Sequence, residues 1–233
     1  MRARRLCAAL ALAAVGVLAL GACAKSSPSV AAYVGEKAFT KADVERAFDS
    51  VPEEQAQQNA ESIRDFIVSM MVVGEVTKRH AEANGKTVPE GDTKAVAQGA
   101  GLPADNPLVE LQARYQAAVQ FLQSEAKPAE PDNTLRHELF DQLTAKGVVN
   151  PGTTFDDVRS AIDSEDLRHL VGVRNLLADL AERYHVRVNP AYGPLALQAN
   201  GVSIANGQAQ VDVDIPVTIE GEQFVTDLTT PAA

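Results

Sequence analysis

The chain is poor in the residues that build reactive and metal-binding sites. It has two cysteines, four histidines and no tryptophan among its 233 residues. A zinc site needs three or four ligands such as cysteine and histidine at close spacing, and the signatures of nucleotide loops and serine elbows are absent from this sequence. The histidines lie far apart and on different predicted elements: His80, His137, His169 and His185. We therefore expect no enzyme, no metal and no cofactor.

Basic residues are also few. Lys and Arg number 21 against 31 Asp and Glu, which gives a net charge of −10, and a chain this acidic does not hold nucleic acid through phosphate contacts. Neighbouring acids such as Glu53-Glu54 and Asp156-Asp157 lie at predicted helix starts, where negative charge complements the helix dipole. They are better explained as helix-start signals than as a general acid and base. We expect neither nucleic acid nor a small-molecule substrate as a partner.

The apolar run at the N-terminus lacks the length of a membrane span. Three arginines precede an uncharged stretch from Leu6 to Leu20, and a spanning helix needs about 20 apolar residues. This is the layout of a secretory signal peptide, and its ending, Leu20-Gly21-Ala22-Cys23, resembles the lipobox of bacterial lipoproteins. We expect residues 1–22 to be cleaved, Cys23 to be lipidated and residues 23–29 to be a flexible tether. The alternative is an ordinary secreted protein in which Cys23 has no such role.

Most of the remaining chain has the periodicity of amphipathic helices. Apolar residues recur every three or four positions, and capping residues and prolines mark where segments begin. The predicted helices are a short one opened by Thr40, then 53–83, 89–100, one opened by Asn106-Pro107, 133–145, 155–162 and 165–183. The last has two adjoining apolar stripes and is expected to be the most buried helix. The predicted fold class is therefore mainly α.

Two short segments have the character of strands. Val30 to Phe39 forms two apolar stretches about Gly35-Glu36, which predicts a small hairpin. His185 to Val188 alternates and predicts a single short strand before a turn. Both segments flank the helical region, so we expect a minor β element beside the helices.

The C-terminal segment, residues 194–233, differs from the rest. Alternating apolar residues flank Asn206-Gly207, in a register that places Ile204 opposite Ala209. This pattern favours a β-hairpin at an edge, because Pro216 cannot occupy a central strand. A disordered tail is the alternative, since the segment is short.

Phe66, Met70 and Met71 are the candidate binding residues. They lie at helical spacing within the predicted helix 53–83. Methionine side chains adapt to many shapes and are common on promiscuous binding surfaces, so these residues are able to line a groove for extended apolar peptides. Ordinary core packing is the competing interpretation for each of them.

Three segments resemble parts of the SurA-type chaperone N-terminal domain. Tyr33-Val34-Gly35-Glu36-Lys37-Ala38-Phe39-Thr40 is similar to the strand and turn that lead into the first helix of that domain. Ala81 to Val88 resembles the end of its long helix, and Val186 to Gly193 resembles its return strand, with Ala191 where arginine is usual. Together the matches cover about residues 31 to 193.

The resemblance implies a multi-helix cradle over residues 30–193, in which the N-terminal hairpin and a return strand near 185–189 join in a small β element. Family members such as SurA, PrsA and trigger factor use this cradle to hold unfolded clients. Many also carry a parvulin prolyl isomerase domain, where this chain has only Ala126 to Asp132. The resemblance therefore implies a binding module without isomerase chemistry.

These observations lead to one functional expectation. We expect a lipoprotein, anchored in the bilayer through acylated Cys23 on the extracytoplasmic face of the cell membrane, that binds unfolded or exported polypeptides without catalysis. Apolar burial would supply the affinity, and the acidic exterior would discourage self-association. The alternative is an adaptor or scaffold lipoprotein that binds one specific envelope partner.

Overall fold

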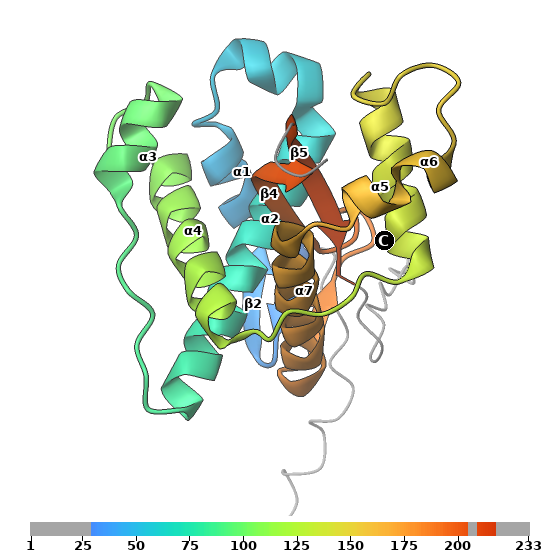
Figure 1. The fold of residues 1–233 in the computed structure, drawn as a ribbon. Coiled ribbons are helices and arrows are strands. Elements are labelled where there is room, and N and C mark those ends of the chain that lie inside the picture. The colour runs from blue at the N-terminus through green and yellow to red at the C-terminus, as the bar shows by residue number, and fades with distance from the viewer. Residues whose placement is uncertain (1–28, 205–208, 218–233) are drawn as a thin grey trace, which may run out of the picture.

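The computed structural model describes residues 29–204 and 209–217, so the predicted signal peptide, Cys23 and most of the predicted tether lie outside the described residues. Within this part the fold is mainly helical, as predicted, with two small antiparallel sheets (Figure 1). The helices are α1 (Lys41–Phe48), α2 (Glu53–Ala83), α3 (Thr93–Ala100), α4 (Pro107–Glu125), α5 (Asn133–Ala145), α6 (Phe155–Ile162) and α7 (Glu165–Arg183). The strands are β1 (Val30–Val34), β2 (Lys37–Thr40), β3 (Val186–Val188), β4 (Ala196–Ile204) and β5 (Ala209–Pro216).

Local capping signals set most of the helix boundaries. At the start of α1 the Thr40 hydroxyl accepts a hydrogen bond from the Asp43 N–H at 3.1 Å, and the Asp43 carboxylate accepts one from the Thr40 N–H at 2.9 Å. The Asn106 side chain caps α4, whose first residue is Pro107. These pairs satisfy backbone groups that a helix end leaves without partners, which is why the sequence predicts them well.

The helix predicted over 89–100 is shorter than expected. It begins at Thr93, because the Asp92 side chain accepts a hydrogen bond from the Ala95 N–H and caps the helix there. The preceding backbone lies hard against α4, since a Cβ built on Gly91 would meet the Ala113 carbonyl oxygen at 2.1 Å. Contact with α4 therefore holds this segment out of a helix.

The three-stranded sheet joins the two ends of the helical region. Its order is β2-β1-β3, with β1 antiparallel to both neighbours. The side-chain amide of Asn189 donates to the Val30 carbonyl at 2.9 Å across 159 residues of sequence. The predicted β element between the N-terminal hairpin and the return strand is confirmed.

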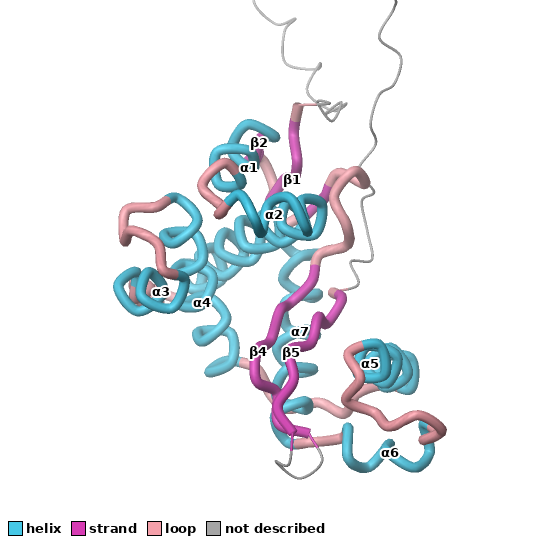
Figure 2. The backbone as a smooth tube through the Cα atoms, turned by 90° about the horizontal axis from the view of Figure 1, so that it is seen from above, coloured by secondary structure: helices cyan, strands magenta, loops and turns pink. Residues whose placement is uncertain are grey.

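The main core lies between α2, α4 and α7, with the β1–β3 sheet at one end (Figures 1 and 2). In α7, eight of nineteen residues are buried, including Leu177 and Val173 at 0% exposure. A Cβ on Gly172 would lie 2.1 Å from the Lys127 carbonyl oxygen, so the linker between α4 and α5 crosses α7 in direct backbone contact. Glycine is required at this crossing.

The C-terminal segment forms a β-hairpin that belongs to the packed fold. Strands β4 and β5 pair antiparallel with Ile204 opposite Ala209, the predicted register. The hairpin extends back to Ala196, and its flanks enter the core: Leu195, Leu197, Ile215 and Val217 are each at most 3% exposed. The disordered-tail alternative is wrong for these strands, because that apolar area is buried against helices. Residues 218–233 of the predicted tail lie outside the described part.

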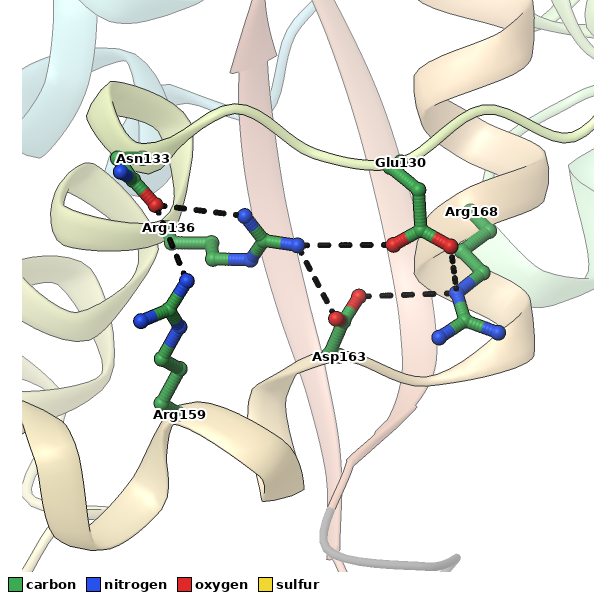
Figure 3. Close-up of polar contacts among 6 residues, drawn as sticks. All are labelled: Glu130, Asn133, Arg136, Arg159, Asp163 and Arg168. Carbon is green, nitrogen blue, oxygen red and sulfur yellow. Dashed lines mark hydrogen bonds and ion pairs between the residues drawn. The ribbon is translucent and has the colours of Figure 1, made fainter.

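Helices α5 and α6 lie on the far side of this hairpin from α2 and α4 (Figure 2). An ion-pair cluster ties them to the linker and to the start of α7 (Figure 3). The Arg136 guanidinium lies 3.1 Å from the Asp163 carboxylate and 3.5 Å from that of Glu130, and the Arg168 Nε lies 3.1 Å from Glu130. Charge therefore contributes directly to the attachment of these two helices.

Candidate binding groove

A cavity of about 1240 Å³ is lined by residues within 37–118, and none of its lining residues belongs to α5 or α6. Its walls are α2, α4, α1 with β2, and the non-helical segment between α2 and α3. We call this cavity the groove, and residues 86–92, which run along it, the strap. The groove is therefore lined by two long helices and by the segment that connects α2 to α3.

The floor of the groove is apolar. Met70 and Met71 contribute from α2, and Leu111 and Ala118 from α4. Met70 is 1% exposed and forms the base, whereas Met71 is half-buried. Gly74, the next residue on the same side of α2, has no atom within 4 Å of a built Cβ, so the space above it is open. The helix period of 3.6 residues brings these positions to one face.

The rim of the groove is charged, but the two signs balance. Its basic residues are Lys37, Arg46, Lys78, Lys86 and Arg114, and its acidic residues are Asp43, Glu75, Glu82, Glu90 and Glu110. Several are paired with one another or with neighbours, as Lys37 is with Glu75 at 2.6 Å and Arg46 with Asp43 at 3.1 Å. A rim of this kind gives no strong preference for a cationic or an anionic guest.

Glu75 joins β2 to α2 at the edge of the groove. Its carboxylate accepts hydrogen bonds from Lys37 at 2.6 Å and from Arg79 at 2.8 Å. Burial raises the pKa of this carboxyl, but the hydrogen bonds and charges of Lys37 and Arg79 outweigh burial and lower the pKa below its ordinary value. Glu75 is therefore ionised at neutral pH and acts as an anchor.

The strap is fixed at its two ends. Lys86 forms an ion pair with Glu125 of α4 at 2.8 Å, and Gly91 touches the α4 backbone at Ala113. Between these points, Val88 and Pro89 line the groove. Proline has no N–H to donate and favours extended backbone, which suits a segment that spans a gap.

The structure separates the three candidate residues. Met70 and Met71 line the groove, but Phe66 is not among its lining residues. The Phe66 ring instead packs edge-on against Tyr115 of α4, with centroids 5.4 Å apart. Sequence reasoning missed the strap, because it placed Pro89 at the start of a helix and Val88 at the end of another, and neither residue indicates a groove. Leu111 and Ala118 lie on the apolar face of the predicted helix that Asn106-Pro107 opens. Nothing in that sequence pattern indicates that the face reaches a cavity.

The histidines of the described residues are not among the lining residues of the groove. No group of three or more His, Cys, Asp and Glu side chains in residues 29–204 and 209–217 has the arrangement of a metal site. His80 lies on α2 beside Phe121, and His137 lies on α5 stacked on Phe155 at 3.8 Å. In the same part of the chain, none of the helices is both long and apolar enough to cross a bilayer.

Comparisons with protein-family models, with curated proteins and with solved structures found no match to this chain. The groove and its surroundings are therefore interpreted from their own geometry.

Proposed function

We propose that this protein is a membrane-anchored, extracytoplasmic lipoprotein that binds unfolded or exported polypeptides in the groove without catalysis. The observation that carries the proposal is the apolar floor formed by Met70, Met71, Leu111 and Ala118 beneath a charge-balanced rim. A guest held by such a surface gains affinity from burial of apolar side chains. Anchoring through Cys23 would keep this activity at the membrane surface.

The size of the groove supports a polypeptide guest. Small-molecule pockets have volumes of about 300–1,000 Å³ and enclose their ligand with a few convergent polar groups. This groove is larger, at about 1240 Å³, and opens along the strap between two long helices. Methionine side chains at its base re-pack around guests of different shape, which favours many clients over one.

Suppression of aggregation tests the proposal. Reduced lysozyme aggregates in the absence of its disulfides, and the purified protein is expected to suppress its light scattering at about equal molar ratio. Met71→Gln places a polar group in the floor and is expected to weaken suppression severalfold. Leu176→Gln is the matched control, because Leu176 is also half-buried but lies on α7 away from the groove. Absence of suppression, or equal loss in both variants, would contradict the proposal.

Two further assays separate the alternatives. A pull-down from envelope extract is expected to yield many unrelated polypeptides, whereas one dominant partner would favour the adaptor or scaffold. A prolyl isomerisation assay on a proline-containing peptide is expected to show no acceleration. A clear rate increase would overturn the assignment as a binding protein without catalysis.

A further inference from the structure

A second surface of the helices, distinct from the groove lining, already holds an extended chain. The β4–β5 hairpin lies between α2, α4 and α7 on one side and α5 on the other (Figure 2). Its flanking and end residues insert apolar side chains that are almost fully buried: Leu195, Leu197, Ile215 and Val217. We call the helical surface that contacts the hairpin the slot.

The slot binds the backbone of β4 as well as its side chains. The Tyr115 hydroxyl accepts a hydrogen bond from the Gln198 N–H at 3.1 Å and lies 3.4 Å from the Gln198 carbonyl, to which it donates. The Ser69 hydroxyl of α2 accepts from the Ala196 N–H at 3.4 Å. A neighbouring strand would make the same kind of bonds to the edge of β4. Any extended residue offers these backbone groups, so this recognition does not depend on sequence.

The slot and the groove are built on the same two helices. Ser69 of the slot precedes Met70 of the groove on α2, and on α4 Tyr115 lies between Leu111 and Ala118, which line the groove. Both surfaces therefore share the α2–α4 pair.

The hairpin is joined to the rest of the described fold by side-chain packing and side-chain hydrogen bonds, without strand pairing. Its two strands form their own sheet, which shares no pairing with β2-β1-β3 in the described residues. It also follows the last helix, so its departure would interrupt no described helix or other sheet. What holds it is the set of apolar contacts and side-chain bonds described above.

We propose that the slot is a binding surface for extended apolar polypeptide and that the C-terminal hairpin is its resident, displaceable occupant. The inference rests on the proposed function, because a client strand is what displaces the hairpin. The free protein then binds clients below its intrinsic affinity, because only the fraction with an open slot is competent for full binding. Weakening the hairpin without changing the slot should tighten binding.

Substitutions in the hairpin test this arrangement in the purified protein. Leu197→Ala and Ile215→Ala remove apolar contacts of the hairpin and leave Ser69 and Tyr115 unchanged. If the open fraction rises tenfold, the apparent Kd for carboxymethylated, reduced lysozyme falls by up to about tenfold. Leu122→Ala is the control: Leu122 is also fully buried, but it lies near the end of α4 and does not line the groove. The apparent Kd of Leu122→Ala for the same client is expected to stay within about twofold of wild type.

Hydrogen exchange on the unmodified protein supplies a second measurement that needs no variant. Added carboxymethylated, reduced lysozyme is expected to speed amide exchange in β4 and β5 while α2 and α7 keep their protection. Client binding with unchanged protection of β4, or with a weaker Kd in Leu197→Ala, would overturn the inference and leave the proposed function intact. Absence of client binding in every variant would instead contradict both.

Discussion

The helical body and the α5–α6 pair share one apolar core, but ion pairs contribute more to the attachment of α5 and α6 than to the packing of the body. The body, made of β1–β3, α1–α4 and α7, is joined through apolar side chains such as Ile67, Val73 and Leu177, all at 0% exposure. The α5–α6 pair buries three leucines of α5, but its junction with the linker and α7 depends on Arg136, Asp163 and their partners. Salt screens ion pairs at a partly exposed junction and protonation of their carboxylates removes them, whereas apolar contacts have no charge to screen or titrate.

This difference predicts that the two regions respond separately to perturbation. Arg136 Nε and Asp163 Oδ1 are buried without a hydrogen-bond partner among the described residues, so the junction is not fully satisfied. A network in that condition stabilises less than a complete one. We therefore expect the α5–α6 pair to open before the body does.

The largest loss of stability is expected at Gly172, where the linker between α4 and α5 crosses α7. Gly172→Ala forces the Lys127 backbone away from α7, because the added Cβ would lie 2.1 Å from its carbonyl oxygen. We expect a loss of about 3 kcal/mol in the free energy of unfolding, measured by urea denaturation. Gly74→Ala in α2 is the control, since nothing lies within 4 Å of its added Cβ. It should stabilise the protein by about 0.5–1 kcal/mol, the helix preference of alanine over glycine. Equal changes in the free energy of unfolding in Gly172→Ala and Gly74→Ala would contradict the direct backbone contact between the linker and α7.

The second largest effect, faster hydrogen exchange in α5 and α6, is expected from substitution of Arg136. Arg136→Ala removes the guanidinium that binds Asp163 at 3.1 Å, and hydrogen bonds to charged groups contribute about 1.5–3 kcal/mol. Hydrogen exchange should rise in α5 and α6 and stay constant in α2. Arg159→Ala, which loses only a 3.4 Å contact with Asn133 among its described interactions, serves as the control and should change neither. Faster exchange throughout the body in Arg136→Ala would show that the two regions unfold together.

The third effect compares the same local motif in the two regions. Thr40 and Thr154 each donate their N–H, at 2.9 Å, and their hydroxyl to an aspartate carboxylate three residues later. Thr40→Ala is expected to lower the global free energy of unfolding by about 1 kcal/mol, because α1 is part of the body. Thr154→Ala should raise exchange only within α6. A matching global loss in Thr154→Ala would break the distinction between the regions.

The smallest effect is expected on the pH dependence of stability, through the carboxylate of Glu75 in the body. The pKa of Glu75 is lowered, so the stability it contributes is complete above its ordinary pKa of about 4.5 and is lost as pH falls through its folded-state pKa. Between about pH 6 and pH 3 the urea midpoint of Glu75→Gln should therefore fall less than that of wild type, by an amount worth at most about 1 kcal/mol. Glu90→Gln, exposed on the strap, is the control and should follow wild type. Parallel curves of urea midpoint against pH for Glu75→Gln and wild type would show that the ion pairs of Glu75 do not stabilise the fold.

Sequence reasoning predicted the elements better than their assembly. Caps such as Thr40 and Asn106 act within a few residues, so their geometry is present in the local sequence. The register of Ile204 opposite Ala209 follows in the same way from alternation about one turn. The groove depends on which face of α2 meets α4, and this is decided by packing between distant segments. Met70 and Met71 were selected as candidates because of the adaptable shape of methionine, whereas Val88 and Pro89 of the strap have no side-chain chemistry that suggests a groove.

The slot and the ion-pair cluster lay beyond prediction for the same reason. Tyr115 and Gln198 are 83 residues apart, and Arg136 and Asp163 are 27 apart. A tyrosine in a helix and an arginine on its surface are common, and nothing near them in sequence indicates a partner. Phe66 was assigned to the binding surface by its spacing, but its neighbour Tyr115 could be known only from the fold.

The pairing of β1 with β3 also limits how early in synthesis or export the fold can form. A chain that emerges N-terminus first, from a ribosome or a translocation channel, presents Val30 long before its partner Asn189. Until then one side of β1 lacks its neighbour and α2 lacks the covering surface of α7. Synthesis or export that stalls before Asn189 therefore leaves an aggregation-prone intermediate with exposed apolar surface and an unpaired strand edge. Folding can be completed only after almost the whole described chain has emerged.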